Sequence, residues 1–218
     1  MTPATLERWS IQAPLLAGSG AAWIALLVQT PVCSMHAGMA SVAGDSALMF
    51  AAMMLPLLYG PIRHVCNLSL ARRRFRATAL FLAPYAILWT AAGILLMEIA
   101  PRLPLAAGIV AVALWQFSPA KQFCVNRCHA FEDLSAFGAR ADFDALRFGT
   151  THAFWCIGSC SGLMLIPMLV PEGEVAAMAI VTIWLLSERL EEPVKPRWSW
   201  RGPIKAARIA RYWLAAQG

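Results

Sequence analysis

The chain has 218 residues, of which 59% are hydrophobic and only 14% charged, and its formal net charge is +6. A soluble domain of this length carries roughly a quarter charged residues, so the composition excludes an ordinary soluble protein and indicates an integral membrane protein. The sequence contains no nucleotide-binding glycine motif, zinc-protease motif or Ser-His-Asp order. It therefore predicts no catalytic site, and enzymatic activity stays an open question.

A membrane-spanning helix needs about 20 mostly apolar residues. The sequence predicts an all-α, polytopic membrane bundle of about six such helices, at residues 14–30, 45–62, 77–99, 103–124, 149–170 and 174–188. Pro56 is expected to kink the second helix. Longer links are predicted at about 63–76 and 125–148. The first apolar segment lacks the basic start and cleavage site of a signal peptide, so we expect it to be retained.

The distribution of Lys and Arg predicts the orientation of the chain. With six spans, every basic residue except Arg102 falls on one side. Because basic residues accumulate in cytoplasmic loops, we expect a multi-pass protein of the bacterial inner (plasma) membrane with both termini in the cytoplasm. Topology and contact with the lipid bilayer explain the positive charge, and no nucleic-acid partner is predicted.

The chain divides by composition into a six-span domain, residues 1–190, and a basic tail, residues 191–218. The tail contains RGPIKAARIARYWLAAQ, in which apolar and basic residues could share a helix, with Lys205, Arg208 and Arg211 beside Ile209 and Tyr212. Basic amphipathic helices of this kind lie in the membrane interface. We expect a C-terminal interfacial helix, with an ordinary polybasic tail as the alternative.

Two stretches, CVNRCH and THAFWCIGSC, carry thiols and imidazoles four residues apart. Residues i and i+4 lie on one helix face, about 6 Å apart along the axis. The stretches are predicted at the cytoplasmic ends of two spans, where thiols stay reduced. Metal ligands are therefore favoured over disulfides, while buried apolar thiols remain the alternative. The candidate ligands are Cys124, Cys128, His152, Cys156 and Cys160.

Other soft ligands lie nearby in the sequence as weaker candidates. Cys33, Met35 and His36 fall in the predicted external loop; the remaining weaker candidates are His64, Cys66 and His129. Methionines also recur in the second and fifth predicted spans. Thiolates and thioethers suit Cu(I), whereas imidazole suits copper or zinc. The ligand set therefore favours a copper ion over zinc.

Three segments resemble a bacterial family of predicted metal-binding integral membrane proteins (domain of unknown function 2182). They are MFAAMMLP, WQFSPAKQFCVNRC and GTTHAFWCIGSCSGLML, followed by a last span that ends in Glu188 and Arg189. The family's fifth-span motif has a Cys pair, whereas this chain has Ser159 before Cys160. The resemblance implies a membrane protein that binds metal.

The sequence favours a protein that handles Cu(I), either as a transporter or as a donor to a cuproenzyme. A metallochaperone or a membrane protein complex is the expected partner. Two alternatives stay open: a thiol-redox or assembly factor of a membrane complex, and a complex subunit with a structural zinc site. Neither Cys pair has the two-residue gap of a thioredoxin-type motif, which favours metal handling over thiol redox chemistry.

Overall fold

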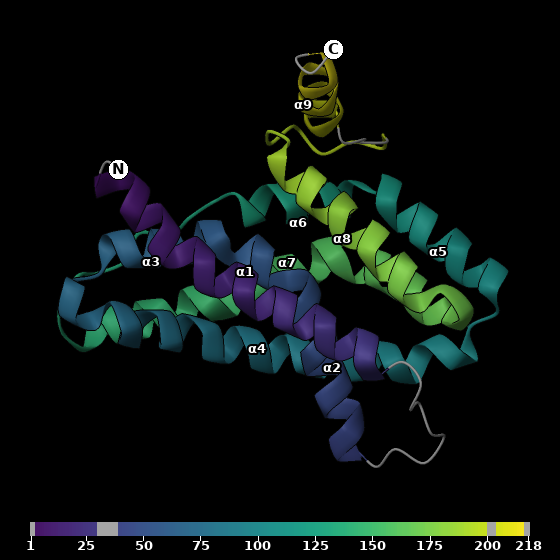
Figure 1. Cartoon of the computed structure of the whole chain (residues 1–218), viewed down its shortest axis with the longest axis horizontal. Coiled ribbons are helices and arrows are strands. Elements are labelled where there is room, and N and C mark those ends of the chain that lie inside the picture. Colours follow the sequence, from purple (N-terminus) through teal and green to yellow (C-terminus); the bar gives the residue numbers. More distant parts are fainter. Residues whose placement is uncertain (1–2, 30–38, 200–203, 216–218) are drawn as a thin grey trace. The chain divides into compact units, whose positions relative to one another are not determined.

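A computed structural model describes residues 3–29, 39–199 and 204–215. These residues form α-helices joined by 3₁₀ turns, and no strand occurs among them, which confirms the all-α class (Figure 1). The helices are α1 (Pro3–Gln29), α2 (Met39–Met54), α3 (Tyr59–Leu68), α4 (Arg74–Ile99), α5 (Leu105–Phe117), α6 (Pro119–Cys128), α7 (Gly138–Leu169), α8 (Glu174–Leu190) and α9 (Ile204–Ala215).

Four helical segments of the described chain are long and apolar enough to cross a membrane: Ile11–Val28, Ala47–Leu68, Ala71–Arg102 and Gly138–Leu169. This supports a membrane protein, whereas the prediction of six spans is not confirmed. The predicted fourth span is divided into α5 and α6, and the predicted sixth corresponds to α8, which has 17 residues. Six spans and the orientation of the termini therefore stay predictions.

Several predicted boundaries change in the structure. Pro56 does interrupt its helix, because the 3₁₀ turn Leu55–Leu58 separates α2 from α3. The link predicted at 125–148 is helical at both ends, since α6 continues to Cys128 and α7 begins at Gly138. Gly138 has a φ of 71°, a left-handed conformation that glycine adopts without steric cost.

The chain folds as two compact units. The first contains Met1–Glu98 and Phe131–Ile157, and the second contains Ile99–Ala130 and Gly158–Gly218. Helix α7 contributes residues to both units. The predicted division into residues 1–190 and 191–218 follows composition, and it stays a prediction.

The core of the first unit is aromatic. Phe81, Tyr85 and Trp89 lie four residues apart on α4 and are completely or almost completely buried. The ring of Tyr85 lies 5.6 Å from that of Phe50 on α2, measured between centroids. A Cβ added to Gly149 would lie 2.2 Å from the backbone oxygen of Phe81. Only glycine therefore permits this close approach of α7 to α4.

Close helix contacts in the second unit also depend on glycines. A Cβ on Gly162 would lie 2.7 Å from the Trp115 side chain, and a Cβ on Gly158 would lie 2.7 Å from Cys124 Sγ. The indole Nε1 of Trp115 donates to the carbonyl oxygen of Gly158 at 3.0 Å. The two glycines thus form a small-residue face on α7 that receives side chains from α5 and α6.

Ser118 and Pro119 explain why α5 and α6 are separate helices. Ser118 is extended, with ψ of 144°, and its hydroxyl accepts a hydrogen bond from the Lys121 backbone N–H at 3.1 Å. Serine at the N-cap followed by proline at the first helical position is a strong helix start. The break begins a new helix that carries both Cys124 and Cys128.

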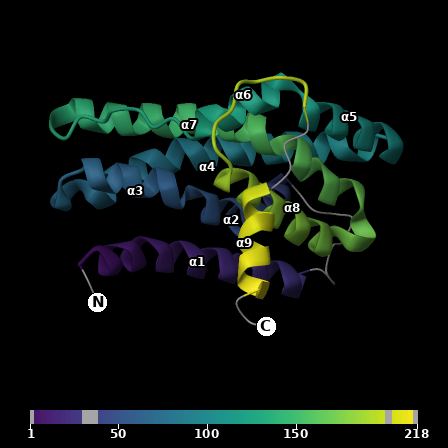
Figure 2. The ribbon, with the colours of Figure 1, turned by 90° about the horizontal axis from the view of Figure 1, so that it is seen from above.

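Residues 191–199, which follow α8, pass beside α6 (Figure 2). Gln122 donates to the Ser199 carbonyl oxygen at 2.8 Å and accepts from the Arg197 backbone N–H at 3.1 Å. One helical turn further along, Asn126 donates to the Val194 carbonyl oxygen at 2.6 Å. We call residues 192–199 the strap, because two amide side chains attach its backbone to α6.

The tail ends in α9, so the predicted C-terminal helix is confirmed. Ile204 and Tyr212 have exposed side chains on this helix. Lys205 Nζ forms an ion pair with Glu192 of the strap at 2.7 Å. The placement of α9 in the membrane interface stays a prediction.

Candidate metal centre

Three of the five predicted ligands belong to the second unit: Cys124 and Cys128 on α6, and Cys160 on α7. Ser159 lies between two of the thiols, because its Oγ is 3.7 Å from Cys128 Sγ and 3.3 Å from Cys160 Sγ. Cys128 and Cys160 are buried, whereas Cys124 is half-buried. Cys124 lies one helical turn before Cys128 on α6, and its Sγ faces Gly158, two residues before Cys160. We call Cys124, Cys128 and Cys160 the thiol cluster.

A cation also contacts the thiol cluster. Arg189, near the end of α8, directs Nη2 towards Ser159 Oγ at 3.3 Å and towards Cys160 Sγ at 3.9 Å. Its carbonyl oxygen lies 3.1 Å from Nε2 of His129. Nδ1 of His129 lies 2.9 Å from the carbonyl oxygen of Val125. Both His129 ring nitrogens thus face carbonyl oxygens, and the imidazole fixes the end of α6 to the end of α8.

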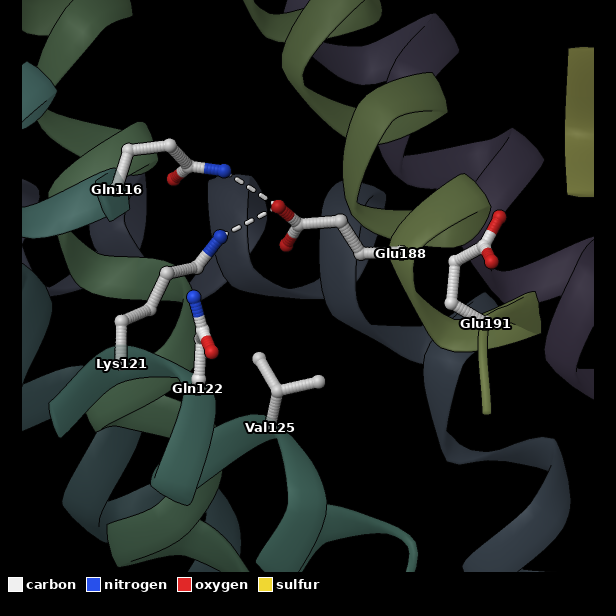
Figure 3. A pocket seen from close by; sticks show the side chains of 6 residues that line it. All are labelled: Gln116, Lys121, Gln122, Val125, Glu188 and Glu191. Carbon is white, nitrogen blue, oxygen red and sulfur yellow. Dashed lines mark hydrogen bonds and ion pairs between the residues drawn. The ribbon is translucent and has the colours of Figure 1, made fainter. Parts of the chain in front are cut away.

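A buried ion pair lies in the same unit (Figure 3). One oxygen of Glu188, Oε1, accepts from Lys121 Nζ at 2.5 Å, from Gln116 Nε2 at 2.5 Å and from Trp184 Nε1 at 2.9 Å. Lys121 and Glu188 are 3% and 8% exposed. Because burying a charge is costly unless it is paired and hydrogen-bonded, this convergence explains how both charges are accommodated.

The ion pair borders a small cavity of about 20 Å³, lined by Gln116, Lys121, Gln122, Val125, Glu188 and Glu191. A space of this size admits one water molecule among polar groups. It is too small for an organic substrate, which normally occupies several hundred Å³. The cavity is therefore large enough for one water molecule beside the ion pair and too small for an organic substrate.

Sequence reasoning missed the ion pair. The sequence suggests that Glu188, near a span end, reaches the membrane interface, and that Lys121 contributes to a basic link. The available signal was that both residues lie within predicted spans, Lys121 in 103–124 and Glu188 in 174–188, and ionisable groups within membrane segments are commonly paired and functional. Their separation of 67 positions in the chain conceals the pairing.

The other two main candidates belong to the first unit and have aromatic surroundings. Cys156 is buried, and its Sγ accepts a hydrogen bond from the Tyr85 hydroxyl at 3.1 Å. His152 is also buried, with its ring centroid 5.6 Å from that of Phe148 and 6.0 Å from that of Tyr85. Both side chains thus form part of the aromatic core of the first unit.

The weaker candidates have local partners or lie outside the described residues. Nε2 of His64 lies 2.8 Å from the Glu132 carbonyl oxygen, and the imidazole stacks on Phe131. Cys66 Sγ lies 3.6 Å from the Thr78 hydroxyl. Cys33, Met35 and His36 fall in residues 30–38, outside the described part of the chain.

Within residues 3–29, 39–199 and 204–215, no group of three or more His, Cys, Asp or Glu side chains is arranged closely enough to hold a metal ion. The described cysteines form no disulfide bond. A tetrahedral zinc site, which needs four ligands, is thus not preformed among these residues. Two soft thiolates suit Cu(I), and the thiol cluster contains enough sulfur for that coordination.

These features define a class of helical proteins with apolar helices of membrane length and thiols on adjacent helices. A family model described as PpoB2, copper chaperone, matches residues 47–207, and the chain belongs to this family. No curated protein and no solved structure matched. The match confirms the expectation of a copper-related family, while the narrower name, domain of unknown function 2182, stays a prediction. The matched segment includes the thiol cluster and Arg189, and it begins after Cys33, Met35 and His36.

Proposed function

We propose that this protein is a membrane-bound copper carrier, which holds Cu(I) on the thiol cluster and delivers it to a cuproenzyme. The observation that carries the proposal is that Cys128 Sγ and Cys160 Sγ both contact Ser159 Oγ, in a chain that belongs to a copper chaperone family. A metallochaperone or a membrane complex is the proposed partner. The protein resides in the inner membrane with both termini in the cytoplasm.

The chemistry of the ligands supports this function. Thiolates are soft ligands that select Cu(I) over the harder ions of the cell. A bare cation in an apolar interior has a prohibitive solvation cost, so a carrier must keep its ion bound to side chains at every stage. The thiol cluster offers more sulfur atoms than a dithiolate requires, so an incoming ligand can replace one sulfur at a time.

Burial suggests different roles for the three thiols. Cys128 and Cys160 are buried and contact the same hydroxyl, and they form the proposed holding pair. Cys124 is half-buried on the same helix as Cys128. It is therefore the proposed exchange ligand, which accepts copper from a donor or presents it to a recipient.

His152 and Cys156 are proposed ligands of a second copper position in the first unit. The Tyr85 hydroxyl donates to Cys156 Sγ, and a donor of this kind stabilises a thiolate. Cys33, Met35 and His36 are proposed to receive copper on the external side. The buried methionines Met53 and Met164 are expected to contribute packing more than coordination, because methionine fills apolar gaps readily.

The decisive measurement is Cu(I) binding by purified protein in detergent, in competition with a chromogenic Cu(I) chelator. Cys128→Ser and Cys160→Ser preserve side-chain size while removing the soft sulfur. Each should lower the affinity for Cu(I) by at least about tenfold, because a dithiolate loses half of its sulfur ligands. Cys66→Ser is the matched control, since Cys66 belongs to the first unit and contacts Thr78.

Metal analysis of the parent separates the alternatives. Near-stoichiometric copper supports the proposal, zinc favours a structural site, and metal-free protein with a titratable disulfide favours thiol redox chemistry. If both Cys→Ser variants compete for Cu(I) as well as the parent does, the thiols serve packing only and the proposed function fails.

A further inference from the structure

Arg189 contacts the thiol cluster from α8. Its guanidinium Nη2 lies 3.3 Å from Ser159 Oγ and 3.9 Å from Cys160 Sγ. Ser159 Oγ in turn lies 3.7 Å from Cys128 Sγ. The same hydroxyl thus connects the guanidinium with both members of the proposed holding pair, and a positive charge is present where copper would bind.

The charge of a copper dithiolate explains what this cation can do. Cu⁺ and two thiols form [Cu(SR)₂]⁻ and release two protons to water, since metal binding requires deprotonated sulfur. The product carries one negative charge. Cys128 and Cys160 are 4% and 1% exposed, so that charge would be buried, and a buried charge needs a counter-charge or strong hydrogen bonds.

Lys121, a buried cation of the same unit, already has a carboxylate partner. Lys121 Nζ lies 2.5 Å from Glu188 Oε1, so the two residues together add no net charge to their surroundings. Arg189 is the cation whose side chain contacts Ser159 and Cys160. Its planar guanidinium is also more weakly hydrated than an ammonium group, which suits a buried contact with an anion.

We propose that Arg189 is the counter-ion of the copper–thiolate complex. Its single positive charge makes the holding pair selective for a monovalent ion that is bound by two thiolates. This inference rests on the proposed function and adds a specificity residue to it. A third thiolate from Cys124 would raise the charge of the complex to −2, beyond what one guanidinium compensates. Cys124 thus serves exchange and does not remain bound together with the other two thiols.

The test compares Cu⁺ with Hg²⁺, because both ions bind two thiolates but give complexes of different charge. Hg²⁺ also binds two thiolates, but Hg(SR)₂ is neutral and needs no counter-ion. Arg189→Gln should weaken Cu(I) binding about 10- to 100-fold, as expected when a charge-assisted contact is removed. The same variant should leave Hg(II) binding close to the parental value. Both ions are measured on full-length protein in detergent by competition, with a Cu(I) chelator and with a small thiol respectively.

Arg189→Lys provides the second variant, because lysine retains the charge with a different head group. Its ratio of Cu(I) to Hg(II) affinity should stay within about threefold of the parent, since the unit charge persists. Equal losses for both ions in Arg189→Gln, or a Lys variant with the ratio of the Gln variant, would overturn the counter-ion role. A parent that binds no Cu(I) through Cys128 and Cys160 would instead refute the proposed function.

Discussion

The two parts of α7 carry ligand-type residues at the same four-residue spacing but in opposite surroundings. In the first unit, the ring of His152 lies among those of Phe81, Tyr85 and Phe148, and Cys156 Sγ accepts from the Tyr85 hydroxyl. Cys160 in the second unit contacts a hydroxyl and a guanidinium. Equal spacing therefore does not imply equal chemistry. The first pair has aromatic neighbours and one hydroxyl donor, whereas the thiols of the second unit also lie near a positive charge, which favours an anionic complex.

The largest expected effect concerns the ion pair of the second unit. Glu188→Ala leaves the positive charge of Lys121 buried without its carboxylate partner. The loss of one member of a buried pair costs about 3–5 kcal/mol of unfolding free energy. The measurement is chemical unfolding in detergent followed by tryptophan fluorescence. Glu172→Ala removes an exposed carboxylate and serves as the control.

A double variant sharpens the same experiment. Replacing Lys121 with Met and Glu188 with Leu removes both charges at similar volume, a change that is often neutral or stabilising for buried pairs. Stability should then return towards the parental value. A double variant as unstable as Glu188→Ala would show that the contribution of Glu188 lies in its bonds to Gln116 and Trp184.

The next effect concerns the first unit. Gly149→Ala places a Cβ 2.2 Å from the Phe81 carbonyl oxygen, so α4 and α7 must separate. Overpacking of this kind costs about 1–3 kcal/mol. Gly20→Ala is the control, because its Cβ meets no atom within 4 Å, and alanine within a helix is neutral or stabilising. Equal stability of the two variants would contradict the close packing of α4 on α7.

A smaller effect distinguishes the two thiol environments. Tyr85→Phe removes the hydroxyl that donates to Cys156 Sγ at 3.1 Å. The expected loss is about 0.5–1.5 kcal/mol of unfolding free energy, the usual contribution of one hydrogen bond. Cu(I) affinity at the thiol cluster should not change, whereas Ser159→Ala should alter it. A Tyr85→Phe variant that loses copper from the cluster would argue that the two environments act as one.

The smallest effect concerns the exposed pair of the tail. A hydrogen bond and ion pair from Lys205 hold the pKa of the Glu192 carboxyl below its usual value of 4.5. The pair therefore adds stability above that pH and loses it as the pH falls through the lowered pKa. Because exposed pairs contribute little, Glu192→Gln should unfold at the parental denaturant midpoint throughout about pH 5–8. A midpoint shift in that range would indicate a stronger contact.

Local features of this fold were predictable from the sequence. Hydropathy identifies the apolar helices, and Pro56 marks the break between α2 and α3. The division of α5 from α6 was missed, although Ser118-Pro119 combines a capping residue with a proline at the first helical position. The apolar run of α5 before this dipeptide concealed that signal, because a hydropathy average does not register where one helix ends and the next begins.

The composition of the candidate site was less predictable. Spacing places Cys124 with Cys128, and His152 with Cys156 and Cys160, because helical periodicity relates residues along one element. It does not determine which thiols meet across helices. The contacts of Ser159 and Arg189 with the thiols depend on glycines that admit close approach and on the position of α8, and neither follows from periodicity. Helical periodicity likewise does not indicate which buried charges pair between distant parts of the chain.

The strap has a consequence for biosynthesis. Residues 192–199 fix α6 through Gln122 and Asn126, and Arg189 precedes them directly in the chain. The ribosome thus synthesises Cys124, Cys128 and Cys160 before the guanidinium and the strap that complete their surroundings. A chain that stops before residue 189 therefore contains the three thiols without Arg189 or the strap.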